Sequence, residues 1–266
     1  MAELEFTLPD GRVLAYAEYG DSDGVPVVFH HGTPGSRLLA TLLDAQASEA
    51  GIRVIAPDRP GFGRSDPDPD RRIEDWPRDV SALMDGLSVR RFGVLGFSGG
   101  GPFALACAAT CPRAGSLGLV SALVPGADGG VFGSLACRMP SLLWLLFQLS
   151  AGIARLSPNM VVGQYTNREV SPAVAEIAAR DFREAFQQDA RAAVHESQLF
   201  AESSAMSLPD VPVIIRHGTH DENAPSAPAR ALATRGNTDF QQLTADHLGT
   251  FLDTRSEVLK SVAASL

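Results

Sequence analysis

Continuous apolar runs alternate with amphipathic stretches along the first half of the chain. The runs have the length of buried strands, and the stretches between them carry the apolar spacing of helices. The strand-like runs are residues 25–31, 52–57, 91–97 and 116–123, and the helix-like stretches are residues 36–50, 73–87 and 99–109. Near the N-terminus, Pro9-Asp10-Gly11 joins two further strand-like runs and predicts an antiparallel hairpin. Strands that are apolar throughout and separated by helices predict an α/β fold with a mostly parallel sheet and helices on both faces.

The alternation stops after about residue 124, where helical spacing continues and no strand pattern occurs. The amphipathic spacing there runs through Ile177, Phe182, Phe186 and Val194. A strand pattern resumes at residues 211–218 and is followed by a helix at 227–234, a strand at 238–244 and a terminal helix from about Arg255. We therefore predict one α/β core, residues 1–124 and 209–266, with a helical insertion at residues 125–208.

Composition and charge argue against two classes of binding partner, nucleic acids and membranes. The formal net charge of −9 argues against a nucleic-acid surface, because a basic excess supplies the affinity of such surfaces. The most apolar stretch, residues 141–154, is shorter than the roughly 20 residues of a membrane span, so it predicts a buried helix. The first residues are acidic where an export signal would be basic, and we expect a cytoplasmic protein.

The three cysteines, Cys107, Cys111 and Cys137, do not form an even disulfide framework, which fits a reducing compartment. Cys107 and Cys111 lie four positions apart on a predicted helix, but no histidine clusters with them. We interpret them as buried thiols rather than metal ligands. We expect no metal site and no cofactor, and the pattern does not define an oligomeric state.

The pattern G-x-S-x-G occurs twice, around Ser22 and around Ser98. Ser22 lies between two predicted strands beside two aspartates, which is turn composition. Ser98 follows a buried strand and precedes a helix of small residues, which is the strand–turn–helix context of a nucleophile elbow. Gly96 and Gly100 are the small neighbours that such a sharp turn needs. Ser98 is therefore the candidate nucleophile.

A nucleophilic serine needs a base, and the base needs an orienting acid. Asp221 directly follows the strand at residues 211–218, and His247 follows the last strand. Both would lie at the carboxyl edge of the sheet, as Ser98 does, so we predict Asp221 as the acid and His247 as the base. Glu222 and Asp128 are alternative acids. The backbone N–H groups of Thr33 and Gly99 are the candidate donors of an oxyanion hole.

Five motifs, in this order, resemble the α/β-hydrolase superfamily: HHGTPGS, PDRPGFGRSD, GFSGGGPFALA, RHGTHDENAP and ADHLGTF. The resemblance spans nearly the whole chain. It implies Ser98, Asp221 and His247 as a catalytic triad, an oxyanion hole at Thr33 and Gly99, and the insertion as the variable cap. One position departs from the family, which usually has glycine where this chain has Asp246. A carboxylate close to His247 would raise the pKa of the imidazole by opposite-charge attraction.

The first part of the insertion is apolar, and we expect it to supply pocket residues: Met139, Trp144, Phe147 and Met160. Such a pocket suits a small hydrophobic substrate. The first hypothesis is a serine hydrolase that cleaves a hydrophobic carboxylic ester, lactone or thioester through an acyl-enzyme.

Two other functions remain open from the sequence. One is a biosynthetic, non-hydrolytic or cyclising enzyme of the same fold. The other is an aminopeptidase of the proline-iminopeptidase type, because the HGTPG motif is similar to that group's. Such an enzyme needs carboxylates in the cap to bind an amino group, and the candidates, which we expect mostly on solvated helix faces, are Glu169, Glu176, Glu184, Glu196 and Glu202.

Overall fold

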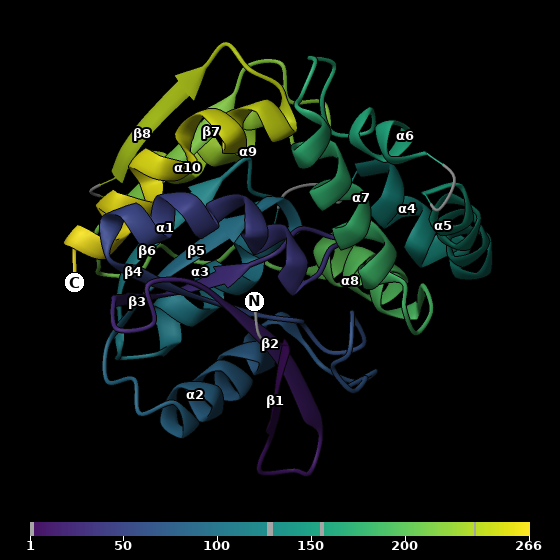
Figure 1. The fold of residues 1–266 in the computed structure, drawn as a ribbon. Coiled ribbons are helices and arrows are strands. Elements are labelled where there is room, and N and C mark those ends of the chain that lie inside the picture. Colours follow the sequence, from purple (N-terminus) through teal and green to yellow (C-terminus); the bar gives the residue numbers. More distant parts are fainter. Residues whose placement is uncertain (1–2, 127–129, 155–156, 237) are drawn as a thin grey trace.

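The computed structural model describes residues 3–126, 130–154, 157–236 and 238–266 of the chain. Within them a single sheet has the strand order β1-β2-β4-β3-β5-β6-β7-β8 (Figure 1). The strands are β1 (Glu3–Thr7), β2 (Val13–Gly20), β3 (Val25–His30), β4 (Ile52–Pro57), β5 (Phe92–Phe97), β6 (Ala114–Val120), β7 (Val213–Gly218) and β8 (Thr238–Leu243).

The predicted fold class is confirmed. Strand β2 runs antiparallel to both of its neighbours, β1 and β4, whereas every pair from β4 to β8 is parallel. The turn at Pro9-Asp10-Gly11 joins β1 to β2 as the hairpin that the sequence predicts. Because the strands from β3 onward point the same way, their carboxyl ends meet along one edge.

Helices cover both faces of the sheet, which explains why its central strands β5, β6 and β7 are buried throughout. In β3 the successive residues Val28 and Phe29 are both fully buried, yet they belong to different hydrophobic clusters. Phe29 packs with α1 (Asp44–Ala50) and α10 (His247–Ala264), which lie on one face (Figure 1). Val28 packs on the other face, where α2 (Trp76–Gly86), α3 (Gly101–Thr110) and α9 (Ser226–Ala233) lie.

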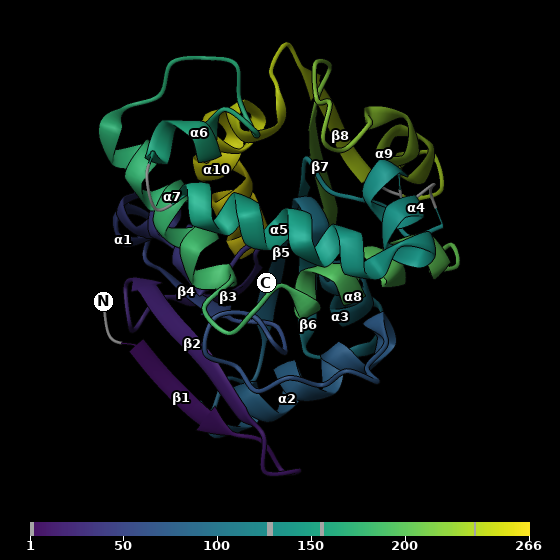
Figure 2. The same cartoon turned by 90° about the vertical axis from the view of Figure 1, so that its right-hand side faces the viewer.

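Between β6 and β7 the chain forms a group of helices with a core of its own. They are α4 (Gly130–Arg138), α5 (Pro140–Ala154), α6 (Pro158–Val162), α7 (Pro172–Ala185) and α8 (Arg191–Glu202), and Figure 2 shows them gathered together. Their buried residues pack around Phe147, Phe182 and Phe186, and Phe62 from the loop after β4 closes this cluster. Among the residues described, no helix is long and apolar enough to cross a bilayer.

Two helix boundaries differ from the sequence prediction. The terminal helix α10 begins at His247 rather than near Arg255, because the carboxylate of Asp246 caps it by accepting a hydrogen bond from the N–H of Gly249. The stretch at residues 36–50 divides into a 3-10 segment, η1 (Arg37–Leu43), and helix α1. Periodicity alone missed the start of α10, since Gly249 lowers the helical signal of its first turn.

The turn from β5 into α3 holds Ser98 in a conformation that few residues adopt. Its φ is +53°, in the left-handed region that is strained for a side chain with a Cβ. A Cβ on Gly96 would lie 2.7 Å from the Cβ of Ala104 and 3.0 Å from the carbonyl oxygen of Gly100. A Cβ on Gly100 would collide with the carbonyl oxygen of His30 and lie 2.6 Å from that of His31. Gly96 therefore lets the turn close tightly on itself, and Gly100 lets it approach the end of β3.

We expect Gly100→Ala to destabilise the protein by about 1–3 kcal/mol, because rigid backbone leaves no room for the methyl group. The matched control is Gly152→Ala in α5, where a Cβ would have no atom within 4 Å. That variant should be neutral or more stable by up to about 1 kcal/mol, since alanine favours helix. Urea unfolding measures both, and equal stability of the two variants would contradict the packing argument.

Candidate active site

The carboxyl ends of four strands bring the predicted site residues to one edge of the sheet. Thr33 lies in the loop after β3, Ser98 directly follows β5, Asp221 lies in the loop after β7, and His247 follows β8. Ser22 is exposed in the turn before β3, and therefore at the opposite edge. The two G-x-S-x-G serines thus lie at opposite edges of the sheet, and the one with the strand–turn–helix context, Ser98, lies at the edge of the other predicted site residues.

His247 and Asp221 form a close, buried pair. The Nδ1 atom of His247 lies 2.9 and 2.8 Å from the two carboxylate oxygens of Asp221. Desolvation disfavours the charged carboxylate, but the hydrogen bond from His247 and those from the loop outweigh it and lower the pKa of Asp221. The N–H groups of Asn223 and Ala224 donate to Asp221 and hold its side chain. An ionised Asp221 places the proton of a neutral His247 on Nδ1 and leaves Nε2 as an acceptor.

The Nε2 atom of His247 is buried and has no hydrogen-bond partner among the described residues. The imidazole packs against Phe97, with ring centroids 5.0 Å apart, and stacks on Tyr165 at 6.3 Å. His247 and Ser98 line the same cavity, whose volume is ≈ 390 Å³. A base with a free nitrogen and a serine hydroxyl thus border one space.

The loop after β3 lies directly against Ser98. A Cβ on Gly99 would lie 3.0 Å from the backbone nitrogen of Thr33, and one on Gly32 would lie 3.4 Å from the Cβ of Ser98. The backbone of Thr33 and that of Gly99 are therefore neighbours beside the serine. Two N–H donors to a shared oxyanion need such proximity.

A buried charge cluster ties this loop to the insertion. The guanidinium of Arg59 donates to the carbonyl oxygens of His31 (2.6 Å) and Gly32 (3.0 Å) and to the hydroxyl of Thr33 (2.9 Å). It also forms two hydrogen bonds, at 2.7 and 2.8 Å, with Glu196 of α8. Arg71 donates a third hydrogen bond to Glu196, at 2.9 Å. The hydroxyl of Thr33 also donates to Glu196, at 2.5 Å. Arg59 and Glu196 are completely buried, so their charges interact at low dielectric.

The carboxylate of Asp246 binds groups in helix α10 and in the insertion. The backbone of this residue is extended (φ −89°, ψ −169°), and its carboxylate accepts from Gly249 in α10 and from Thr166 and Asn167 in the insertion. Desolvation opposes the charge, but these hydrogen bonds outweigh it and lower the pKa of Asp246. The aspartate that replaces the usual glycine is therefore a helix cap and a link to the insertion.

Comparisons with known proteins identify the family of the chain. The model of the alpha/beta hydrolase family matches residues 27–260. The chain belongs to the α/β hydrolase family. It is 33% identical over 239 residues to a non-heme chloroperoxidase of Streptomyces lividans, covering 84% of each chain.

Solved structures of α/β hydrolases share the fold. The enol-lactonase from Burkholderia xenovorans LB400 superposes with a TM-score of 0.75 at 21% identity, covering 98% of this chain and 99% of that one. The esterase from Exiguobacterium antarcticum gives the same TM-score at 19% identity, covering 99% and 98%.

Of the four apolar residues predicted to line the pocket, one lines the cavity in the structure and three do not. Phe147 lines the ≈ 390 Å³ cavity, together with Phe132, Leu146, Phe182 and Phe200. Met139 and Met160 are more than half exposed and are not lining residues, and Trp144 packs against the core of the insertion. Of the alternative acids, Glu222 is exposed, and Asp128 lies outside the described residues.

Most of the insertion glutamates were expected on solvated faces, and Glu169, Glu176 and Glu202 are exposed. Glu196 is the exception, because it is fully buried between two arginines. Sequence reasoning missed this cluster because Arg59 and Glu196 are separated by 137 positions. Their charges become partners only when α8 docks. The available signal was weak: Glu196 lies on the same helix face as Ala192, Ala193 and Phe200.

Replacing Glu196 with alanine leaves Arg59 and Arg71 buried without their counter-charge. We expect Glu196→Ala to lower the free energy of unfolding by about 3–5 kcal/mol. Glu202→Ala, at an exposed position of the same helix, is the control and should change it by less than about 0.5 kcal/mol. Urea denaturation followed by tryptophan fluorescence measures both variants, and a Glu196→Ala protein as stable as the control would contradict a structural role for the cluster.

Proposed function

We propose that this α/β hydrolase is a serine hydrolase that cleaves a hydrophobic carboxylic ester, lactone or thioester through an acyl-enzyme. One observation carries the proposal. His247 is anchored through Nδ1 by Asp221, while its free Nε2 and Ser98 share a cavity with the backbone of Thr33 beside them. A nucleophile, a base and an orienting acid in this relation are the elements of serine-dependent acyl transfer.

The proposed reaction has two halves. Ser98 Oγ attacks the substrate carbonyl while its proton passes to Nε2 of His247, and the negative oxygen that forms accepts from the N–H groups of Thr33 and Gly99. Collapse of this intermediate expels the alcohol or thiol, which takes the proton from Nε2, and leaves an ester on Ser98. Water then attacks this ester with Nε2 again as the base, which releases the acid and restores the serine. Asp221 stabilises the imidazolium in both halves.

The cavity supports a small apolar substrate. Its volume of ≈ 390 Å³ is in the range of ligand pockets, and aromatic and aliphatic side chains of the insertion form one side of it. In the proposal, residues 125–208 act as a cap that closes the site over a core of residues 1–124 and 209–266. The cap excludes water around the scissile bond and selects the shape of the acyl chain or alcohol.

The decisive variant is Ser98→Ala. We expect it to abolish turnover of short p-nitrophenyl esters and of lactones, because the acyl group then has no oxygen to bond to. It should also abolish covalent labelling by a fluorophosphonate probe. Ser22→Ala removes the serine of the second G-x-S-x-G pattern and should leave both readouts unchanged. Undiminished ester hydrolysis by Ser98→Ala would rule the mechanism out.

Asp221→Asn tests the orienting acid separately. An asparagine keeps the size of the side chain but loses the charge that selects the tautomer of His247, so kcat should fall by about 10⁴-fold. Glu222→Gln removes the neighbouring exposed charge and should retain activity. Steady-state kinetics on one ester compares them; a large loss with Glu222→Gln and none with Asp221→Asn would reassign the acid.

The same experiments separate the alternatives. A folded wild-type protein that takes up no fluorophosphonate favours a non-hydrolytic biosynthetic enzyme, and release of proline from its naphthylamide favours an aminopeptidase. Support for the latter from the five glutamates is weak, since none of them lines the described cavity and Glu176, Glu184 and Glu196 are each paired with arginine. Because the Streptomyces relative is named a chloroperoxidase, halogenation is the activity to measure next if no ester is cleaved.

A further inference from the structure

Four acidic side chains are buried in the described part of the chain: Asp58, Asp181, Glu196 and Asp221. Three of them face a basic group. Asp58 is paired with Arg37, Glu196 with Arg59 and Arg71, and Asp221 with His247. Asp181, on α7, is only 5% exposed, and no described arginine, lysine or histidine forms an ion pair with it. Burying a charged carboxylate costs free energy unless a cation or a full set of hydrogen-bond donors compensates it. Asp181 therefore needs a further partner.

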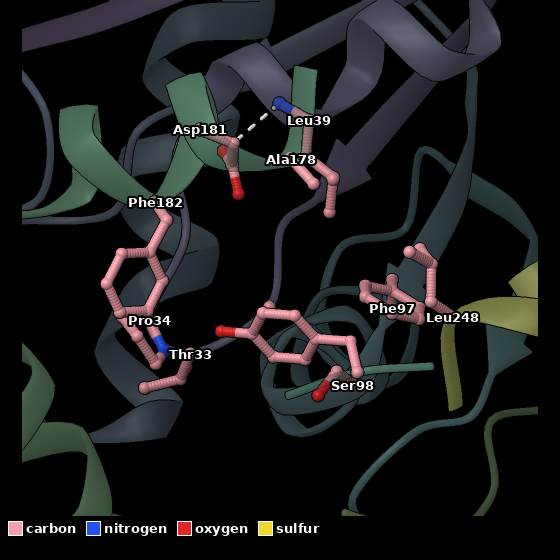
Figure 3. A pocket seen from close by; sticks show the side chains of 11 residues that line it. Thr33, Pro34, Leu39, Phe97, Ser98, Ala178, Asp181, Phe182 and Leu248 are labelled. Carbon is pink, nitrogen blue, oxygen red and sulfur yellow. Dashed lines mark hydrogen bonds between the residues drawn. The ribbon is translucent and has the colours of Figure 1, made fainter. Parts of the chain in front are cut away.

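The donors around Asp181 satisfy only one of its two oxygens. Oδ1 accepts from the N–H of Ser36 (2.7 Å), the hydroxyl of Ser36 (2.8 Å) and the N–H of Leu39 (3.1 Å). No described residue donates to Oδ2. Figure 3 shows Asp181 bonded to Leu39 on one side, with its other oxygen pointing into the space between Leu39, Phe182 and Thr33. The free oxygen thus points into a recess rather than into packed protein.

This recess adjoins the nucleophile. Its volume is ≈ 30 Å³, and its lining includes Asp181, Ser98 and Thr33. Thr33, Pro34, Ser98, Tyr165 and Phe182 also line the ≈ 390 Å³ cavity, so the recess is a side chamber of the candidate active site. A space of this size holds one group about as large as a water molecule. The rest of its lining is mostly apolar: Leu39, Phe97, Ala178, Phe182 and Leu248.

The surroundings favour a positive group there. Desolvation raises the pKa of Asp181 to about 7, and the negative charge of Asp58 also raises it, whereas the hydrogen bonds from Ser36 and Leu39 lower it. A raised pKa is expected for a buried carboxylate that has no cation beside it. Desolvation and then the charge of Asp181 also raise the pKa of Tyr165, which lines the same recess. The rings of Tyr165 and Phe182 offer the aromatic surface that favours cations.

We propose that the recess is a binding subsite for the ammonium group of the substrate, with Oδ2 of Asp181 as its acceptor. The inference rests on the proposed serine hydrolase and refines its substrate class to small esters or lactones that carry a primary amine on a short, apolar acyl chain. The large cavity takes the apolar part, and the recess takes the amine. Asp181 is then a specificity-determining residue, and Ser98, His247 and Asp221 keep the chemistry.

The test compares methyl esters that differ only in the terminal group. Methyl β-alaninate, its hydroxyl counterpart and methyl butyrate have the same number of heavy atoms and end in ammonium, hydroxyl and methyl. Two further sets of three esters, with one methylene fewer and one methylene more in the acyl chain, vary the distance between the carbonyl and the terminal group. In the set that fits, we expect the wild-type kcat/KM for the amine to exceed that for methyl by about 10-fold or more, as for a hydrogen bond to a charged group.

Asp181→Asn is the informative variant, because its oxygen can still accept from Ser36 and Leu39 and so keep the loop in place. It should lose the preference for the amine, mainly through a higher KM, and hydrolyse the methyl-terminated ester as the wild type does. Glu176→Gln removes the same charge from an exposed position of α7 and should keep the preference. Equal rates for amine and methyl esters in the wild type, or a uniform loss on all three esters in Asp181→Asn, would overturn the subsite.

A binding measurement distinguishes failure of the subsite from failure of the hydrolase. Propylammonium chloride should raise the Tm of the wild type and of Ser98→Ala above that in sodium chloride of equal ionic strength, and should not do so for Asp181→Asn. If no ester is cleaved but this shift occurs, the subsite stands and the proposed reaction is wrong. If esters are cleaved and no shift or amine preference occurs, the hydrolase stands and the subsite is wrong.

Discussion

The guanidinium of Arg59 lies where three parts of the molecule meet, and the geometry of the candidate site depends on the bonds it makes. It donates hydrogen bonds to two backbone carbonyls and one hydroxyl of the loop after β3, and it also donates two hydrogen bonds to Glu196 in the insertion. A loop that presents N–H groups inward must turn its carbonyls elsewhere, and buried carbonyls need donors. Arg59 supplies those donors. The proposed role of the Thr33 N–H in an oxyanion hole relies on this arrangement of the loop.

The same cluster explains how the insertion is held in register with the sheet. Apolar packing alone tolerates small sliding movements, whereas an arginine fork and a carboxylate bond only in one relative position. Glu196 fixes α8 through Arg59 and Arg71, while Asp181 of α7 fixes the start of η1 through Ser36 and Leu39. Asp246 makes a third link, from the start of α10 to Thr166. Each of these links ends beside a residue of the candidate site.

Local patterns were enough to predict the frame of the site, because each of its parts is encoded within a few residues. A buried strand, a glycine pair and a small-residue helix define the turn at Ser98, and strand ends place Asp221 and His247 at the same edge. The links to the insertion were not predictable in this way. Asp181 lies among Arg180, Arg183 and Glu184, which resembles a solvated face, although its spacing from Ala178 and Ala185 puts it on the buried side of α7. Only the docked structure shows which charges lack a partner.

The distribution of buried charge gives the site two different environments. Around Glu196, two buried arginines face one buried carboxylate, and this cluster lies behind Thr33, where the oxyanion is proposed to form. Around Asp181, one carboxylate faces aromatic and aliphatic side chains without a cation, so this side favours positive charge. A substrate with an electron-rich carbonyl at one end and an ammonium at the other matches both. For the proposed substrate, this polarity, rather than the apolar cavity alone, would direct the ammonium to Asp181 and the carbonyl to Ser98.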